Sequence, residues 1–187
     1  MPSQINLEAA EHNLKQGKEL KKNGQLDEAI EKYKTAVDLN PEYVDGLKQL
    51  AAAYQAKKEL NKAVKCYEKI LALKPKNAAA YLGLAKILQR QKKAIPALAN
   101  YQKALEVKPK QPVRVYLNYA NALNRQGQLK AAIAAYEKVL KRNPKKPAGV
   151  YVSLGSAKQK QKKFEEAIAN FQKALELQPN NKNLYLK

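Results

Sequence analysis

The segment from residue 94 to residue 110 reads AIPALANYQKALEVKPK, and its pattern returns twice further along the chain. Residues 131–146 read AAIAAYEKVLKRNPKK, and residues 165–181 read EEAIANFQKALELQPNN. In each segment an alanine, an aromatic ring four residues later and a closing proline recur, with apolar residues at helical spacing between them. A phrase that returns at a fixed period predicts a stack of similar structural units.

The same spacing extends through nearly the whole chain at three positions. These are a proline (Pro41, Pro75, Pro109, Pro144 and Pro179), an alanine (Ala29, Ala63, Ala97, Ala132 and Ala167) and an aromatic residue (Tyr33, Tyr67, Tyr101, Tyr136 and Phe171), each 34 or 35 residues from the next. They predict five repeats, at residues 10–43, 44–77, 78–112, 113–147 and 148–181.

Each repeat contains two amphipathic helical patterns. In residues 78–112 the first pattern includes Tyr81 and Leu84, the second includes Ala97 and Tyr101, and the polar turn RQKK separates them. The proline after the second pattern ends the helix because it cannot donate a backbone hydrogen bond. The predicted unit is therefore helix, turn, helix and stop. The recurring alanine lets the two helices approach closely, and the ring fills the space between them.

These positions resemble the tetratricopeptide repeat. Repeat 78–112 supplies Tyr81, Leu84, Ala85, Leu88, Ala97, Tyr101, Ala104 and Pro109, and repeat 148–181 supplies Tyr151, Leu154, Gly155, Ala167, Phe171, Ala174 and Pro179. The resemblance implies an all-α fold, a right-handed α-α solenoid superhelix of ten main helices in a single domain over residues 1–187. It also implies a protein-binding scaffold.

Composition argues against chemistry in this chain. One Cys and one His exclude an intramolecular disulfide and a zinc site built from Cys and His. No glycine-rich phosphate loop, nucleophile–base pair or carboxylate dyad occurs, so we expect no enzyme activity, no catalytic residue, no cofactor and no metal. We interpret His12 as solvated and Cys66 as a packed apolar residue. The N-terminus lacks the apolar core of a signal peptide and no long apolar run follows, which predicts a cytoplasmic protein without membrane insertion.

The resemblance also implies a concave groove lined by first-helix residues that point away from the second helix. The predicted ligand-binding residues are the basic Lys86, Arg90, Arg125 and Lys160, the polar Asn118, Asn121 and Ser153, and the apolar Leu82, Leu117 and Val152. They give a basic, amide-rich groove with an apolar strip. Two alternatives stay open: a cation in the last helical turn is stabilised by about 0.3–1 kcal/mol through the helix dipole alone, and the apolar residues could serve only to pack. The family's clamp for a C-terminal carboxylate does not fit, since Gly149 and Ser153 stand where its last basic pair belongs.

Three hypotheses for function follow. The first is a non-catalytic scaffold that binds an extended, acidic protein or peptide segment in the groove. The second is a basic RNA- or DNA-binding solenoid, suggested by a net charge of +20 and by lysines gathered at the turns. It ranks second because ten of the eleven tyrosines occupy packing positions, which leaves few rings to stack on bases. The third is the N-terminal adaptor region of a longer enzyme.

The end of the chain carries a further expectation. Residues 182–187 match the start of a sixth repeat or a capping helix, with Tyr185 at the aromatic position, and there the chain stops. We therefore expect a fragment of a longer protein. We also expect an uncapped end that exposes Ile168, Phe171 and Leu175 and that self-associates.

Overall fold

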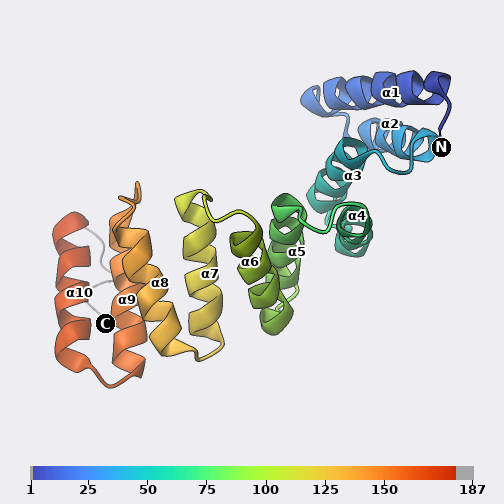
Figure 1. The fold of residues 1–187 in the computed structure, drawn as a ribbon. Helices are drawn as coiled ribbons and strands as arrows, with labels where there is room; N and C mark the ends of the chain where they lie inside the picture. The colour runs from blue at the N-terminus through green and yellow to red at the C-terminus, as the bar shows by residue number, and fades with distance from the viewer. Residues whose placement is uncertain (1, 180–187) are drawn as a thin grey trace. The chain divides into compact units, whose positions relative to one another are not determined.

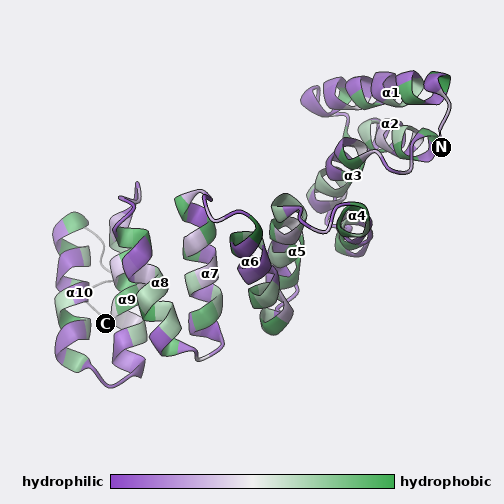
Figure 2. Cartoon of the chain, in the orientation of Figure 1, coloured by the Kyte–Doolittle hydropathy of each residue, from purple (hydrophilic) through white to green (hydrophobic). Residues whose placement is uncertain are grey.

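The computed structural model describes residues 2–179, and this part of the chain is all helical (Figure 1). The helices are α1 (Gln4–Lys22), α2 (Leu26–Leu39), α3 (Val44–Ala56), α4 (Leu60–Leu73), α5 (Ala78–Arg90), α6 (Ala94–Val107), α7 (Val113–Arg125), α8 (Leu129–Leu140), α9 (Pro147–Lys160) and α10 (Phe164–Leu177). The predicted all-α fold is confirmed, with ten helices within these residues. Each helix shows hydrophobic and hydrophilic residues, as expected of amphipathic helices that bury one face (Figure 2).

The chain divides into two compact units, unit 1 at residues 1–91 and unit 2 at residues 92–187. In unit 1, α1 packs on α2 and α3 on α4, while α2 contacts α3 and α4 contacts α5. In unit 2, each of the helices α6 to α10 packs on the next along the chain. Predicted repeat 78–112 is therefore shared, with α5 in unit 1 and α6 in unit 2. The repeat boundaries and the single domain stay predictions, and the predicted sixth repeat at 182–187 lies outside the described residues.

Alanine controls how closely the paired helices pack. The five alanines that recur with the repeat (Ala29, Ala63, Ala97, Ala132 and Ala167) are at most 2% exposed. A larger side chain at such a position would have to force the helices apart, at a cost of about 1–3 kcal/mol. The predicted steric role of this alanine agrees with its burial.

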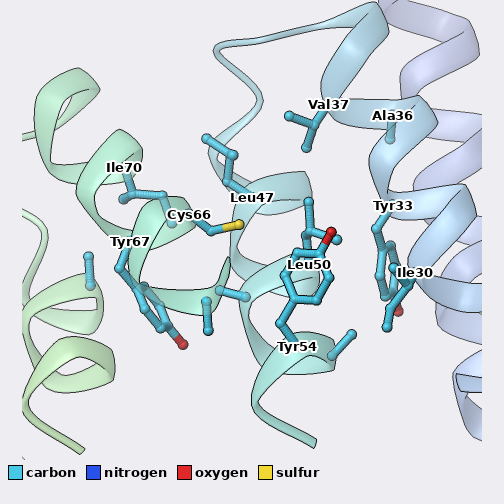
Figure 3. Close-up of a cluster of buried hydrophobic side chains, with 14 of the residues drawn as sticks. Ile30, Tyr33, Ala36, Val37, Leu47, Leu50, Tyr54, Cys66, Tyr67 and Ile70 are labelled. Atoms are coloured by element: carbon cyan, nitrogen blue, oxygen red, sulfur yellow. The ribbon is translucent and has the colours of Figure 1, made fainter. Parts of the chain in front are cut away.

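Aromatic rings fill the space that the alanines leave. Tyr33, Tyr101 and Tyr136 are among the largest fully buried side chains of the described residues. In unit 1, Leu47 and Leu50 of α3 lie between side chains of α2 and those of α4, including Tyr67 (Figure 3). Each layer is thus closed by its neighbours, which is why no single helix pair would be stable alone.

A left-handed residue connects the two helices of each predicted repeat. Residues at one repeat position have positive φ: Gly24, Lys58, Lys92, Gly127 and Lys162, at 84°, 63°, 59°, 71° and 62°. The recurrence of one turn geometry follows from the recurrence of the turn sequence. Only two of these five residues are glycine, which adopts this conformation without steric cost.

The two ends of the described chain depart from expectation. Helix α1 begins at Gln4, six residues before the first predicted repeat, and the Ser3 side chain caps it by accepting from the backbone N–H of Asn6 at 3.2 Å. The expectation that Phe171 is uncovered is wrong: the ring is only 7% exposed because it packs inward on Gly155 of α9. Ile168, a turn earlier on α10, is 55% exposed as expected.

Candidate functional site

The predicted ligand-binding residues fall on three helices. Leu82, Lys86 and Arg90 lie on α5 of unit 1, while the other seven lie on α7 and α9 of unit 2. Helices α7 and α9 contact each other, although α8 lies between them in the sequence. We call these seven residues the α7–α9 face: Leu117, Asn118, Asn121 and Arg125 on α7, and Val152, Ser153 and Lys160 on α9.

The hydroxyl of Tyr136 lies where α7 and α9 meet. It donates a hydrogen bond of 2.7 Å to Oδ1 of Asn121. Burial raises the pKa of this hydroxyl, and hydrogen bonding to the side chains of Asn124 and Ser153 offsets part of the rise. A side chain of α8 thus fixes polar groups of the helix before it and the helix after it. Because Asn121 uses its oxygen for this bond, its amide N–H groups remain to donate elsewhere.

A similar arrangement involves the preceding repeat. Burial raises the pKa of Tyr101 on α6, and hydrogen bonding to Asn118 on α7 lowers it in part. In unit 1 the equivalent ring, Tyr67, accepts a hydrogen bond of 2.8 Å from Nε2 of Gln55 on α3. Polar residues of the first helices therefore serve as partners of buried tyrosine hydroxyls, a role that the sequence analysis did not assign to them.

The basic residues of the face are exposed. Arg125 and Lys160 are the last residues of α7 and α9, so each also benefits from the helix dipole. Within the described chain neither residue forms an ion pair with a carboxylate. Nζ of Lys160 lies 3.5 Å from Oδ1 of Asn124, which links the end of α9 to α7. The face thus carries two cations whose charge is not neutralised by an acidic neighbour.

The apolar and small polar residues are less accessible. Leu117 and Val152 are half-buried, so part of each side chain packs between helices, as the alternative interpretation holds. Ser153 donates a hydrogen bond of 3.0 Å to the backbone carbonyl of Gly149 within α9. These residues can form the floor of a contact surface but offer limited area.

Sequence reasoning missed the hydroxyl of Tyr136, while Asn124 falls at a groove-lining repeat position but outside the predicted ligand-binding residues. The hydroxyl was visible in the repeat pattern, because tyrosine rather than phenylalanine occupies the ring position in four of the five repeats. The ring was interpreted as packing alone. The hydroxyl could have been predicted from the polar residues that face it. These residues lie on the first helix of the same repeat and on the first helix of the next repeat.

The three predicted ligand-binding residues of unit 1 all lie on one helix, α5. On α5, Lys86 and Arg90 are exposed and Leu82 is half-buried. An open pocket of about 550 Å³ lies beside the connection between α2 and α3, and its lining includes Glu42, Tyr43 and Asp45. This pocket contains none of the predicted ligand-binding residues.

Charge is unevenly divided between the units. Residues 92–187 contain twenty Lys and Arg against five Glu, a net charge of +15. Residues 1–91 contain sixteen Lys and Arg against eleven Asp and Glu, a net charge of +5. The α7–α9 face therefore belongs to the strongly basic half of the chain.

Candidate reactive groups are sparse in residues 2–179. Cys66 is buried, and burial raises the pKa of its thiol to about 11, which keeps it protonated at neutral pH. Exposed His12 hydrogen-bonds Gln16 at 2.8 Å. The described residues hold no group of three His, Cys, Asp or Glu side chains placed to bind a metal ion. None of their helices is long and apolar enough to span a membrane.

Comparison with known families assigns almost the whole chain to one kind of repeat. A TPR repeat model matches residues 17–58. Two tetratricopeptide repeat models match residues 44–77 and 148–181, and residues 76–145. A search of curated proteins found no match.

Solved structures with the same fold include a crystal structure of MamA protein. It is 26% identical with a TM-score of 0.83, over 92% of this chain and 93% of that chain. YrrB, described as a TPR protein with an unusual peptide-binding site, is 21% identical with a TM-score of 0.83, over 93% of this chain and 88% of that chain. MamA 41-end from Desulfovibrio magneticus RS-1 is 21% identical with a TM-score of 0.82, over 93% of this chain and 97% of that chain. The predicted solenoid fold is confirmed by these likenesses.

Proposed function

Because the chain belongs to the tetratricopeptide-repeat family, a class of protein-interaction scaffolds, we propose that its α7–α9 face holds an extended, acidic segment of a protein partner. The scaffold has no catalytic role in this proposal. The YrrB likeness supports the fold alone, and the ligand is argued from the residues of this chain.

The observation that carries the proposal is the bond between Tyr136 and Asn121. It leaves the amide N–H groups of Asn121 as donors, and donors are what the carbonyl oxygens of an extended peptide require. An extended main chain leaves its own hydrogen-bonding groups unused, so it can take such a donor from a side chain.

Charge supports an acidic ligand. Arg125 and Lys160 are exposed cations without a carboxylate partner in the described residues, and they follow Asn121 and Ser153 along their helices. Carboxylates of the ligand would form charge-assisted hydrogen bonds with them. The half-buried Leu117 and Val152 would contact apolar side chains between the acidic ones.

The test is binding of short fluorescein-labelled peptides, one rich in Glu and one with the same composition but Lys for Glu, followed by fluorescence anisotropy. We expect the acidic peptide alone to bind, and to bind more weakly as salt shortens the Debye length from about 10 Å at 0.1 M to about 3 Å at 1 M. The variant R125E/K160E should lose this binding. The control K130E/K162E makes the same change in net charge at positions outside the face.

Equal loss in the two double variants would overturn the assignment, because it would mean that net charge and not the face attracts the peptide. Binding of both peptides by the native chain would overturn the acidic preference. The predicted residues of α5 (Leu82, Lys86 and Arg90), the cytoplasmic location and the hypothesis of an adaptor region in a longer enzyme stay predictions.

A further inference from the structure

Two connections at one end of unit 2 concentrate positive charge. The α6–α7 connection contains Lys108 and Lys110, and the α8–α9 connection contains Lys141, Arg142, Lys145 and Lys146. All six side chains are exposed. Both connections lie at the same end of their helices, opposite the α7–α8 and α9–α10 turns (Figure 1). We call these six residues the basic edge.

The two connections are linked through Tyr116 of α7. The guanidinium of Arg142 lies over the ring of Tyr116, with Cζ 4.0 Å from the ring centroid. The hydroxyl of the same tyrosine donates a hydrogen bond to the backbone carbonyl of Pro109 in the α6–α7 connection. Arg142 is therefore held against a ring that is itself attached to the other connection. The cations form one surface rather than two separate loops.

Among the described residues, no acidic side chain neutralises this surface. No Asp or Glu occurs between residues 107 and 117 or between residues 138 and 147. Within residues 2–179 none of the six cations forms an ion pair with a carboxylate. Of the two equivalent connections in unit 1, the α2–α3 connection contains Glu42, and Asp45 just beyond it pairs with Lys48 at 3.6 Å. The α4–α5 connection contains the exposed Lys74 and Lys76 and no acidic residue. Two successive connections that both lack an acidic residue and together carry six cations therefore occur in unit 2.

We propose that the basic edge binds the phosphate backbone of a nucleic acid, independently of its base sequence. A nucleic acid is a continuous polyanion, and a protein that neutralises several phosphates gains affinity from released counterions. The flat face of the Arg142 guanidinium packs on the ring of Tyr116. This leaves the N–H groups at the edge of the guanidinium to donate to phosphate oxygens. The binding is sequence-independent because contacts to phosphate oxygens carry no information about the bases.

The other polyanions fit this edge less well. An anionic lipid surface favours apolar side chains that insert beside the cations. Among the large apolar side chains exposed in the described chain, only Val107 directly precedes an edge connection in the sequence, and it is 36% exposed. An acidic peptide gains specificity from amide donors such as Asn121, which lie on the α7–α9 face and not on the edge. Duplex DNA carries one charge per roughly 1.7 Å of its axis, denser than an acidic peptide, and matches a patch with no anion between its cations.

The test compares two variants that lose the same charge. The edge variant is K108Q/K110Q/K145Q/K146Q, and the control variant is K92Q/K93Q/K130Q/K162Q, whose lysines lie at the helix turns of unit 2 away from the edge. Binding of labelled duplexes of two unrelated sequences is measured over a series of salt concentrations. Helical circular dichroism and the unfolding midpoint of each variant establish that it is folded.

We expect the native chain to bind both duplexes with equal affinity. The edge variant should bind at least about tenfold more weakly at 0.1 M salt, with a shallower dependence on salt because fewer counterions are released. The control variant should bind within about twofold of the native chain. The edge variant should keep its affinity for the acidic peptide, which separates this proposal from the function of the α7–α9 face.

Equal weakening of the two variants would overturn the proposal, since diffuse charge would then explain the binding. A single preferred duplex sequence would overturn its sequence independence. Vesicles with phosphatidylserine that bind the native chain and displace the duplex, with loss in the edge variant, would reassign the edge to lipid.

Discussion

The buried hydroxyl of Tyr136 donates to Oδ1 of Asn121 at 2.7 Å, so a core residue of α8 determines which groups of α7 remain available at the surface. This one hydrogen bond contributes to the packing of the core and also orients a side chain of the proposed binding face. Loss of the Asn121 acceptor would remove this bond and leave the buried hydroxyl with the side chains of Asn124 and Ser153 alone. The polar residues of the α7–α9 face are therefore constrained by stability as well as by any ligand.

Replacement of Asn121 should separate these two roles. Asn121→Ala removes the acceptor of the 2.7 Å bond, and we expect the free energy of unfolding to fall by about 0.5–1.5 kcal/mol, because Asn124 and Ser153 remain beside the Tyr136 hydroxyl. Asn121→Asp keeps an acceptor oxygen, so the loss of stability should stay below about 0.5 kcal/mol, while acidic peptides bind less well to the added negative charge. Urea denaturation followed by circular dichroism measures the first effect and anisotropy the second. Equal destabilisation by both changes would show that the hydrogen bond does not contribute.

Glycine spacing between helices gives a second prediction. A Cβ atom on Gly83 of α5 would collide with the ring of Tyr67 on α4, whereas a Cβ on Gly149 of α9 would meet nothing within 4 Å. We expect Gly83→Ala to lower the free energy of unfolding by about 1–3 kcal/mol through overpacking. Gly149→Ala should raise it by about 0.4–1 kcal/mol, because alanine has less conformational freedom in the unfolded chain. The same sign in both variants would contradict this account.

Three lysines adopt the left-handed turn conformation that two glycines adopt elsewhere. Lys162 has φ of 62°, so Lys162→Gly should relieve a steric cost of about 1–2 kcal/mol and lose part of that gain to the larger entropy of unfolded glycine. A net stabilisation of about 0.5 kcal/mol is expected. Gly127→Ala, at φ of 71°, should destabilise by about 1–2 kcal/mol. Thermal unfolding of both variants checks the pair, and a destabilising Lys162→Gly would count against stored strain in this turn.

Much of the fold could be predicted from the sequence because its signals are repeated. Ala29 and Ala97 occupy the same repeat position as three other alanines, so all five predict the same close approach of two helices. A single period also places every helix, every turn and every proline that ends a helix. The family comparisons and the burial of these residues agree with that interpretation. Repetition averages out the ambiguity that a lone helical pattern would have.

The features that the sequence did not predict depend on the direction in which individual side chains point, which a repeat pattern does not specify. Phe171 and Ile168 stand three residues apart on α10, yet the first packs on Gly155 and the second is exposed. The division into two units also has no signal, since the turn RQKK before α6 resembles the turns within other repeats. Arg125 and Lys160 could be predicted as surface cations from their positions in the repeat. The Tyr136 hydroxyl, which bonds their neighbour Asn121, could not, because Tyr136 was interpreted as a core residue alone.

The last prediction concerns the buried thiol. Burial raises the pKa of Cys66 from 9.0 to about 11, and the positive charge of Lys69 opposes the rise. At pH 8 the folded protein therefore holds about a hundredfold less thiolate at this residue than the unfolded chain, and thiolate is the reactive form. We expect alkylation of Cys66 by iodoacetamide to be slower by at least that factor in buffer than in urea.

The same difference makes stability depend on pH. Because the folded pKa lies above the unfolded value, the contribution of the thiol is fully present below about pH 9 and is lost as the pH rises towards about 11. The advantage of the native chain over Cys66→Ala in free energy of unfolding should accordingly shrink between these limits, by up to about 1.4 kcal/mol per pKa unit. Buried tyrosines whose pKa does not depend on Cys66, such as Tyr33 and Tyr101, titrate in both proteins and cancel in the comparison. An advantage that stays constant from pH 8 to pH 10.5, together with fast alkylation in buffer, would mean that the thiol is accessible and that α4 does not bury it.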